Sequence, residues 1–344
     1  MPELEKVRFD GKLKVKIERG GDPVEPAPDE ALVRVESCGI CGTDLRQFEG
    51  RWPQPEYTPG HEFVGTVIRA GSSVGEVGEG DRVTAALVES CGECALCEQQ
   101  RTNLCRTGGV LTESRDGAMA THVTVPAGML HRIPDGIASD EGVLLEPLSV
   151  AVHGLRMCEE TEGRTIAVCG AGTLGLLFVQ AAAVLGASRV VCTARHPFQR
   201  DLAESLGADT AVNAQELPDD LAGSVDIAVD CVGGRGEGLS QAMTLVRPGG
   251  TIVAVGGYQG LAGVDMWKLV RNELQLRGAF CYSIRDGMHD MKMAIGMAAE
   301  GKVNLGRLVT HRYPLSEAQE AFETALDKTS RESVKVVLAC GEAV

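Results

Sequence analysis

Four cysteines lie close together in a polar loop of the sequence. In CGECALCEQQRTNLC they follow a C-x2-C-x2-C-x7-C pattern, at Cys91, Cys94, Cys97 and Cys105. Four thiolates at this spacing can surround one tetrahedral zinc ion at about 2.3 Å each and close it to water. An iron–sulfur cluster is the chemical alternative, and a chance cluster of core cysteines is disfavoured because the loop has no apolar period. A closed site of this kind is structural, so it indicates no reaction.

A second set of metal-binding residue types is spread along the chain. Cys41 stands in CGICGTDLR, His61 and Glu62 in PGHEFVG, and Glu146 in LLEPLSV. A thiolate, an imidazole and a carboxylate leave one zinc position open for water or an alcohol, as a catalytic zinc site requires. Taken singly, each residue has an ordinary alternative: a buried thiol, a hydrogen-bonded core histidine or a solvated carboxylate. Sequence separation alone does not show that the four residues meet.

A glycine motif marks a candidate dinucleotide site. Gly170, Gly172 and Gly175 form G-x-G-x-x-G directly after the strand-like TIAVC and at the start of an apolar helical stretch. The first glycine allows a tight turn, the second lets the backbone approach the pyrophosphate, and the third lets helix and strand pack closely. The helix N-terminus, with Thr173 and Leu174, then faces the phosphates. The alternative, an ordinary glycine-rich turn, is disfavoured by the surrounding strand–turn–helix–strand pattern.

The residues about twenty positions further on bear on the choice of cofactor. An acid there would bind the ribose 2'-hydroxyl of NAD, but the second strand ends in Thr193, Ala194 and Arg195. Ala194 takes the place of the acid, and Arg195 and Arg200 supply two cations where a 2'-phosphate would lie. This pattern favours NADP over NAD. Solvated arginines at a helix start are the alternative interpretation.

The pattern of apolar and turn-forming residues changes along the chain and divides it into regions. From residue 12 to about 135, short strands are broken by Gly and Pro, which predicts a β-rich domain. From Thr165 to Phe280, apolar strands alternate with helical stretches, which predicts a parallel sheet covered by helices. The last region has a helix opening at a capping box from Ser316 to Gln319 and a final strand, and we assign it to the first domain. The expected domains are 1–150, 151–283 and 284–344, with the cysteine loop at about 90–106.

Composition and charge limit the class of protein and its partners. A length of 344 residues predicts two domains. The 48 acidic residues exceed the 33 basic ones and are dispersed, which disfavours nucleic acid and anionic membranes as partners. No apolar run approaches the ~18 residues of a membrane span, and the N-terminus lacks an apolar signal region, so we expect a cytoplasmic protein. The twelve cysteines then indicate metal ligands and core residues rather than disulfides.

Taken in order, GICGTDLR, PGHEFVG, GDRV, the four-cysteine loop, EPLSVAVHG and GAGTLG resemble one family. From about residue 10 to 340 the chain is similar to the zinc-containing medium-chain alcohol dehydrogenases, particularly the polyol, threonine and sugar dehydrogenase branch related to sorbitol dehydrogenase. The resemblance implies an α/β fold in which a doubly wound, parallel Rossmann domain is inserted in a GroES-like β-rich catalytic domain. It implies two zinc ions per chain, one structural on the cysteine loop and one catalytic on Cys41 and His61. Glu62 and Glu146 would bind the catalytic ion directly, through water or in alternation.

The resemblance also implies a reaction. Zinc would polarise an alcohol oxygen, so that an alkoxide forms near neutral pH and gives a hydride to the nicotinamide. Thr43 matches the hydroxyl that passes the alcohol proton toward solvent, whereas Arg46 stands where simple alcohol dehydrogenases have a histidine and cannot act as an ordinary base. The nicotinamide would rest at the carboxyl ends of two strands, beside Val232, Gly233, Val255 and Gly256. Plain Val-Gly turns are the alternative at these positions.

The resemblance implies a small-molecule substrate with a secondary hydroxyl, of the polyol, sugar or cyclitol type. Phe48, Trp52 and Tyr57 are candidate pocket walls, or core residues. A homo-oligomer, tetramer or dimer, is implied, with LQLRGAF as a candidate edge strand. Two other functions remain as alternatives: a zinc-independent enone or quinone reductase of the same superfamily, and a non-catalytic nucleotide-binding protein. The joint presence of the zinc and proton-relay positions disfavours both.

Overall fold

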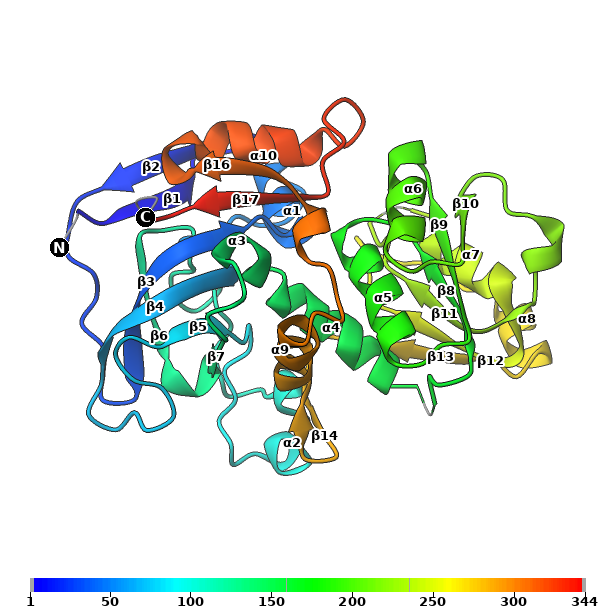
Figure 1. The fold of residues 1–344 in the computed structure, drawn as a ribbon, viewed down its shortest axis with the longest axis horizontal. Helices are drawn as coiled ribbons and strands as arrows, with labels where there is room; N and C mark the ends of the chain where they lie inside the picture. The colour runs from blue at the N-terminus through cyan, green and yellow to red at the C-terminus, as the bar shows by residue number, and fades with distance from the viewer. Residues whose placement is uncertain (1–2, 159, 235, 342–344) are drawn as a thin grey trace. The chain divides into compact units, whose positions relative to one another are not determined.

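The chain divides into two structural units, which the computed structural model describes over residues 3–158, 160–234 and 236–341. Unit 1 comprises Met1–Glu146, Ser283–Glu300 and Leu305–Val344. Unit 2 comprises Pro147–Tyr282 and Gly301–Asn304. The sequence placed these limits at residues 150 and 283. The chain therefore builds most of unit 1, then unit 2, and returns to finish unit 1, as the colours of Figure 1 show.

A seven-stranded mixed sheet forms the centre of unit 1. Its neighbours run in the order β16 (Val309–Pro314), β17 (Lys335–Ala339), β3 (Glu30–Gly39), β4 (Glu62–Ala70), β5 (Arg82–Ala85) and β7 (Leu130–Arg132). A further strand, β6 (His122–Pro126), pairs with β3. All pairs are antiparallel except the parallel pair of β16 and β17. Pairing of β17 with β3 places the final strand of the chain beside residues that lead to the candidate metal site.

An aromatic cluster packs helices and a hairpin onto this sheet. The hairpin consists of β1 (Glu5–Phe9) and β2 (Val15–Arg19), and the helices are α1 (Gly42–Phe48) and α10 (Ala318–Leu326). The rings of Phe48 and Phe322 lie 4.9 Å apart between centroids, and Phe9 meets Phe322 at 6.0 Å. Phe48 is fully buried, so it is a core residue and not a pocket wall. The capping box expected at Ser316 is also wrong, because α10 begins at Ala318 with no side-chain cap.

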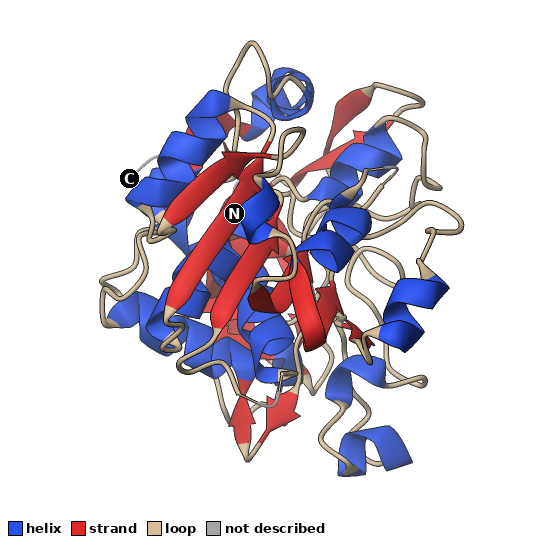
Figure 2. Ribbon diagram, turned by 90° about the vertical axis from the view of Figure 1, so that its right-hand side faces the viewer, coloured by secondary structure: helices blue, strands red, loops and turns tan. Residues whose placement is uncertain are grey.

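Unit 2 contains a six-stranded sheet in which every pair is parallel. The strands run in the order β10 (Thr210–Asn213), β9 (Arg189–Ala194), β8 (Thr165–Cys169), β11 (Val225–Asp230), β12 (Val246–Ala254) and β13 (Gln275–Gly278). Its helices are α5 (Thr173–Val184), α6 (Pro197–Ser205), α7 (Gly238–Leu245) and α8 (Met266–Arg271). Helices cover both sides of strands in Figure 2, which explains why the central strands β8 and β11 are mostly apolar and buried. The strand order reverses between β8 and β11, where doubly wound sheets bind nucleotides.

The cysteine loop is attached to a segment of unit 1 that comes much later in the chain. It carries α2 (Ala95–Glu98) and a short 3-10 turn, Thr102–Leu104. The carbonyl of Gln100 accepts hydrogen bonds from the hydroxyl of Ser283 and, at 3.2 Å, from the backbone N–H of Ile284. That later segment continues as β14 (Ile284–Arg285), β15 (Met288–His289) and α9 (Asp290–Ala299). These bonds hold the loop against the body of unit 1.

Two helices complete the described structure, α3 (Ser139–Gly142) and α4 (Leu145–Arg156). Glu146, the last residue of unit 1, stands in the first turn of α4. Among the described residues, no helix combines the length and the apolar character needed to cross a membrane. All twelve cysteines have free thiols.

Candidate active site

Three metal-binding side chains come together in unit 1. Cys41, His61 and Glu62 each offer one ligand atom, and these three atoms lie within 4.8 Å of one another. Strand pairing brings them together: Gly39 at the end of β3 pairs with Glu62 at the start of β4, so the residues just beyond Gly39 lie beside His61. His61 is 5% exposed and Glu62 is 2% exposed. The site is thus built by two antiparallel strands and the start of α1.

Glu146, the fourth predicted ligand, is close to this group but not part of it. Its side chain is buried at the start of α4, and its charge helps to raise the pKa of His61. Within the described residues, its carboxylate is not among the ligand atoms that lie within 4.8 Å of one another. The structure therefore brings three of the four predicted ligands together and places the fourth nearby.

The electrostatics of the group suit a divalent cation. Burial alone would lower the pKa of His61, but the charge and hydrogen bond of Cys41, with the charges of Asp44 and Glu146, raise it well above its usual range. The Nδ1 atom of His61 is buried without a hydrogen-bond partner in the described chain. A buried group with several acids and an unsatisfied imidazole nitrogen fits zinc, which takes nitrogen, sulfur and carboxylate ligands.

Two buried residues that position the ligands were missed from the sequence. Asp44 is 1% exposed and accepts a hydrogen bond from the backbone N–H of Cys41 at 2.8 Å. Lys335 of β17 donates to the carboxylate of Glu62, and to the carbonyl of Ile40 at 3.1 Å. The signal for Asp44 was its place in GTDLR, and the signal for Lys335 was one cation in the otherwise apolar strand SVKVVLA. A buried lysine in such a strand requires an acidic partner.

Two further residues of α1 lie next to the group. Thr43 is partly exposed, and its hydroxyl has no hydrogen-bond partner among the described residues. The guanidinium of Arg46 lies over the ring of Trp52, 4.9 Å from its centroid. Tyr57, the other aromatic residue expected in a substrate pocket, lines a different hollow together with Arg115 and none of the three ligands. Trp52 therefore remains as the aromatic residue near the site.

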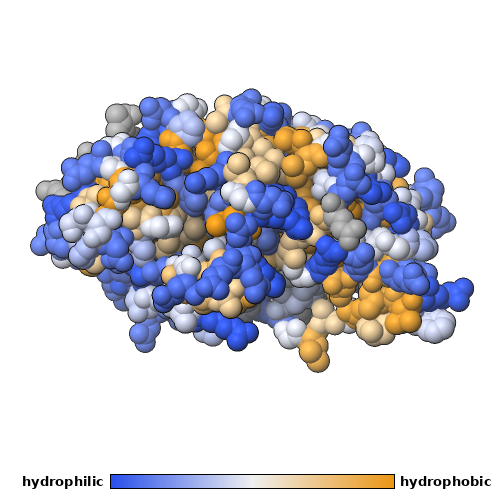
Figure 3. All heavy atoms as spheres, turned by 90° about the horizontal axis from the view of Figure 1, so that it is seen from below, coloured by the Kyte–Doolittle hydropathy of each residue, from blue (hydrophilic) through white to orange (hydrophobic). Residues whose placement is uncertain are grey.

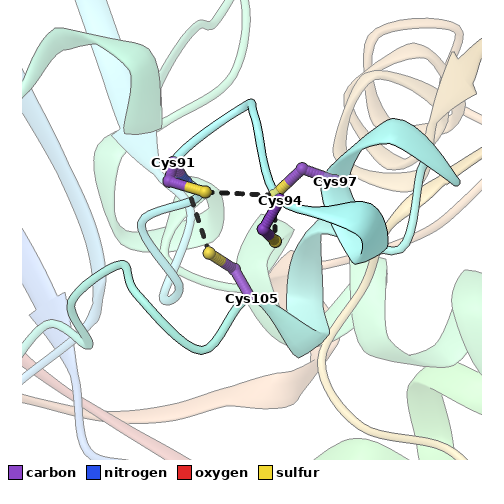
Figure 4. A group of neighbouring side chains, drawn as sticks. All are labelled: Cys91, Cys94, Cys97 and Cys105. Carbon is purple, nitrogen blue, oxygen red and sulfur yellow. Dashed lines mark hydrogen bonds between the residues drawn. The ribbon is translucent and has the colours of Figure 1, made fainter.

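The four cysteines of the loop also face one another. Figure 4 shows their sulfur atoms directed toward a common centre, and all four lie within 4.8 Å of one another. The sulfur of Cys97 is 3.6 Å from that of Cys94 and 3.9 Å from that of Cys91. The N–H of Cys91 donates to the sulfur of Cys105 at 3.3 Å and contributes most to lowering the pKa of Cys105 to about 5. Four convergent thiols, one of them readily ionised, fit a closed metal site.

Two of the three glycines of the motif, Gly170 and Gly175, occupy positions that disfavour a side chain. Gly170 follows β8 with φ +100°, in the left-handed region. A Cβ atom at Gly175 would lie 1.7 Å from the carbonyl oxygen of Gly170. Gly172 is the N-cap of α5, so Thr173 and Leu174 lie in its first turn with their N–H groups at the helix start. This turn can bind a pyrophosphate at the N-terminus of a twelve-residue helix.

Comparison with known proteins adds independent observations. Residues 27–135 match the alcohol dehydrogenase GroES-like domain, and residues 173–300 match the zinc-binding dehydrogenase domain. Sheep (Ovis aries) sorbitol dehydrogenase is 33% identical over 315 residues, which cover 88% of this chain and 87% of that protein. D-arabitol-phosphate dehydrogenase of Enterococcus avium is 30% identical and is covered to 88%, as is this chain. A zinc-binding dehydrogenase of Sinorhizobium meliloti 1021, solved with NADP, is 32% identical with a TM-score of 0.88, covering 98% of this chain and 100% of that one.

This chain belongs to the zinc-containing medium-chain alcohol dehydrogenase family. The α/β fold with a GroES-like domain and a Rossmann domain, expected from the sequence, is confirmed. So is the polyol dehydrogenase branch. Members of this family use zinc and a nicotinamide cofactor, and the chain is an oxidoreductase that interconverts alcohols and ketones.

The second strand of the dehydrogenase's Rossmann sheet ends without an acid. Ala194 closes β9 and is 1% exposed. Arg195 is exposed, and Arg200 donates hydrogen bonds to the carbonyls of Ala194 and Arg195, at 3.3 Å each. Neither guanidinium forms an ion pair with an acid in the described part of the chain. The end of β9 therefore carries two cations beside a small residue.

A buried acid connects the two segments of the dehydrogenase that contain the predicted nicotinamide contacts. Asp230, at the end of β11, accepts from the N–H of Val232 at 2.9 Å and from the hydroxyl of Tyr258 at 2.5 Å. Its carbonyl accepts from the N–H groups of Val255 and Gly256, at 3.1 and 3.0 Å. The segments after β11 and β12 therefore lie side by side. Asp230 and Tyr258 were not recognised from the sequence, because nothing local to either residue indicates the partner.

Proposed function

We propose that this enzyme oxidises a secondary hydroxyl of a polyol, sugar or cyclitol to a ketone, and catalyses the reverse reduction. The observation that carries the proposal is the meeting of Cys41, His61 and Glu62 at one buried point. Two of the relatives named above act on a sugar alcohol or on its phosphate. A zinc-free reductase would not need this set of ligands, and a closed structural site would have four.

We propose two zinc ions per chain. Cys91, Cys94, Cys97 and Cys105 would hold the structural ion, and Cys41 and His61 the catalytic one, to which Glu62 and Glu146 would bind directly, through water or in alternation. When bound, zinc supplies a Lewis acid for the alcohol oxygen, and the nicotinamide supplies the hydride acceptor. The chain holds three ligands in a buried group, which leaves a coordination position for substrate.

The residues around the metal ligands have positioning and proton-transfer roles in this proposal. Asp44 fixes the backbone of Cys41, and Lys335 holds the carboxylate of Glu62. Thr43 accepts the alcohol proton, since its hydroxyl is partly exposed and has no partner in the described chain. Arg46 cannot continue the relay because a guanidinium does not deprotonate. The proton therefore passes from Thr43 to solvent.

We propose NADP as the preferred cofactor. Gly170, Gly172 and Gly175, with Thr173 and Leu174, would hold the pyrophosphate at the start of α5. Arg195 and Arg200 would hold the 2'-phosphate, because they are cations without acidic partners in the described chain and Ala194 leaves room beside them. Val232, Val255 and Gly256 would border the nicotinamide at the carboxyl ends of the strands.

We further propose a homo-oligomer, dimer or tetramer, in the cytoplasm. Apolar side chains gather on the right of Figure 3, the side on which α8 and β13 lie in Figure 1. The exposed large side chains of this region include Trp267 at 72% and Val270 at 65% exposure on α8, and Phe280 at 52% two residues after β13. Strand β13 ends the sheet order, so a second copy could add its own β13 and cover these residues. Twelve free thiols are compatible with a reducing compartment.

The test is the appearance of reduced cofactor absorbance when zinc-loaded protein meets polyols, sugars, cyclitols, amino alcohols and simple primary alcohols, each with NADP and with NAD. Turnover of the polar secondary alcohols, with higher kcat/KM for NADP, is the expected result. Turnover of enones alone, unaffected by zinc removal, would favour the zinc-independent reductase. Cofactor binding with no turnover of any alcohol or ketone would favour the non-catalytic alternative.

A further inference from the structure

Arg46 is a cation that forms no ion pair with an acid in the described chain. It lies on α1, five residues after Cys41, and is partly buried. The ring of Trp52 supports its guanidinium, and no hydrogen bond or ion pair to another described residue engages it. The nearby Glu49 is bonded to Arg51 instead. Its five N–H donors are therefore available to a ligand, on a side chain that an aromatic ring keeps in place.

A second such cation, Lys328, lies close to Arg46. It follows α10, and its ammonium has no hydrogen bond or ion pair within the described residues. The side chain of Lys328 is exposed, but the protein atoms around it remove part of its solvation and lower its pKa, and the positive charges of Lys335 and Arg46 lower the pKa further. Phe48 of α1 packs against Phe322 of α10 with 4.9 Å between ring centroids, so the packing of these helices places the two cations in the same part of unit 1. The carboxylate of the neighbouring Asp327 accepts a hydrogen bond from the backbone N–H of Ser330.

Both cations interact electrostatically with residues in or next to the metal-binding group. Burial lowers the pKa of Arg46, and the charge of Cys41 acts against this, so the guanidinium is within electrostatic reach of that thiolate. The charge of Lys335 acts on Lys328, and Lys335 donates a hydrogen bond to Glu62. Lys328 is therefore linked to the metal-binding group through Lys335. A metal ion there would bind Cys41 and Glu62, so these two acids would not form ion pairs with Arg46 or Lys328. The chain has a net charge of -15, so acids are plentiful. Two neighbouring cations without an acidic ion-pair partner therefore need another explanation.

We propose that Arg46 and Lys328 bind an anionic group, phosphate or carboxylate, on the substrate whose hydroxyl reaches the Cys41–His61–Glu62 group. The inference rests on the proposed dehydrogenase function and narrows its substrate to an acidic polyol or sugar, such as a phosphate ester or a sugar acid. Two parallel N–H donors of an arginine can bind two oxygens of a planar carboxylate or a tetrahedral phosphate, and a lysine adds a point charge. The substrate is then oriented by two ends, its hydroxyl at the metal and its anion at the cations.

Steady-state kinetics on matched substrates tests this inference. The probes are sorbitol, sorbitol 6-phosphate and gluconate, each with the zinc-loaded enzyme and saturating cofactor. The wild-type enzyme should prefer an anionic probe, and Arg46→Gln should reduce the ratio of anionic to neutral kcat/KM by roughly 10- to 100-fold, the loss expected for a charge-assisted contact, mainly through KM. Lys328→Gln should act in the same direction. Arg19→Gln is the matched control, because this exposed arginine of β2 pairs with Glu5 at 2.6 Å, and it should leave the ratio unchanged.

Three outcomes would overturn the inference. One is turnover of neutral polyols with no preference for the anionic probes, which leaves the proposed function intact. Another is an unchanged ratio in Arg46→Gln and Lys328→Gln. The third is a loss of NADPH affinity in both variants, measured by cofactor fluorescence, with the ratio retained, because the cations would then bind the cofactor's phosphates.

A binding measurement separates this inference from a failure of the proposed function. If the enzyme oxidises no alcohol at all, calorimetric titration of zinc-loaded protein with sorbitol 6-phosphate still reports on the two cations. Binding that Arg46→Gln abolishes and Arg19→Gln retains would support the anion site without the reaction. Absence of binding in the wild-type protein would overturn it.

Discussion

At the scale of single residues, the candidate active site depends on charges that only tertiary contacts can balance. Glu62 and Lys335 are 2% and 2% exposed, and each is the other's charged partner. A buried ion pair contributes little net stability compared with apolar residues, but removing one partner leaves an uncompensated charge. The pair therefore fixes where the Glu62 carboxylate lies more than it stabilises unit 1.

Replacement of Lys335 should show directly how the ion pair with Glu62 affects stability. Lys335→Met should lower the free energy of unfolding by about 3 to 5 kcal/mol, because the carboxylate of Glu62 loses its partner. The double variant Lys335→Met with Glu62→Leu should regain most of that loss, and urea unfolding measures both. Losses that simply add, or a single-variant loss below about 1 kcal/mol as in exposed pairs, would contradict this assignment.

Replacement of a cation at the end of β9 tests the choice of cofactor. Arg195→Ala should weaken NADPH binding by roughly 1 to 3 kcal/mol, the scale of a lost charge-assisted hydrogen bond, with little effect on NADH. Titration of cofactor fluorescence measures both. Arg189→Ala is a matched control, since that exposed arginine stands at the opposite end of the same strand. Equal losses for NADPH and NADH would rule out a 2'-phosphate contact.

At the scale of secondary structure, hydrogen bonds between side chains join the strands that present the metal ligands. Glu36 of β3 accepts from Thr66 of β4 at 2.6 Å and from Ser139 of α3 at 2.5 Å. Burial alone would raise the pKa of Glu36, but these bonds and the charge of Arg82 outweigh it and lower the pKa below its usual value. The carboxylate thus connects three elements of unit 1 in its ionised form.

This network predicts a pH-dependent stability. Because the folded pKa of Glu36 lies below the unfolded value of about 4.3, its contribution is present above that pH and is lost as the pH falls through the folded value. Glu36→Gln should therefore cost about 1 to 2 kcal/mol at pH 7, and less as the pH falls below about 4. Urea unfolding at several pH values measures the difference, with the exposed Glu25→Gln as control. A cost that stays constant over this range would contradict the assignment.

Which elements could be predicted from the sequence depended on how local their signals are. The glycine turn, the cysteine loop and most strands of unit 2 follow from spacing and apolar runs, which need no knowledge of partners. Strand β10, only Thr210–Asn213 and half-buried, has too weak a pattern and was not recognised. Lys335 was missed for another reason: its partner Glu62 is 273 residues away, and only the pairing of β17 with β3 brings them together. For Phe48 the sequence left a pocket wall and a core residue open, because an aromatic residue has the same sequence signal in both places, and the structure shows the core position.

At the scale of the whole molecule, the exposed apolar residues on α8 and beside β13 predict self-association. The protein should sediment as a dimer or larger assembly, and Trp267→Glu should shift it toward monomer, because a charge in an apolar interface is costly. Val24→Glu is the control, since Val24 is 69% exposed but lies in unit 1. A wild-type protein that sediments as a monomer at micromolar concentration would contradict the proposed edge contact.

The central claim is that a zinc ion at the Cys41–His61–Glu62 group carries the reaction, separately from the zinc of the cysteine loop. The most direct measurement is zinc content and alcohol turnover, taken together, in wild-type protein and in Cys41→Ala. The account predicts about two zinc ions and turnover in the wild type, against one zinc ion, retained NADPH binding and no turnover in the variant. Turnover that survives in Cys41→Ala, or two zinc ions still bound to it, would contradict the account.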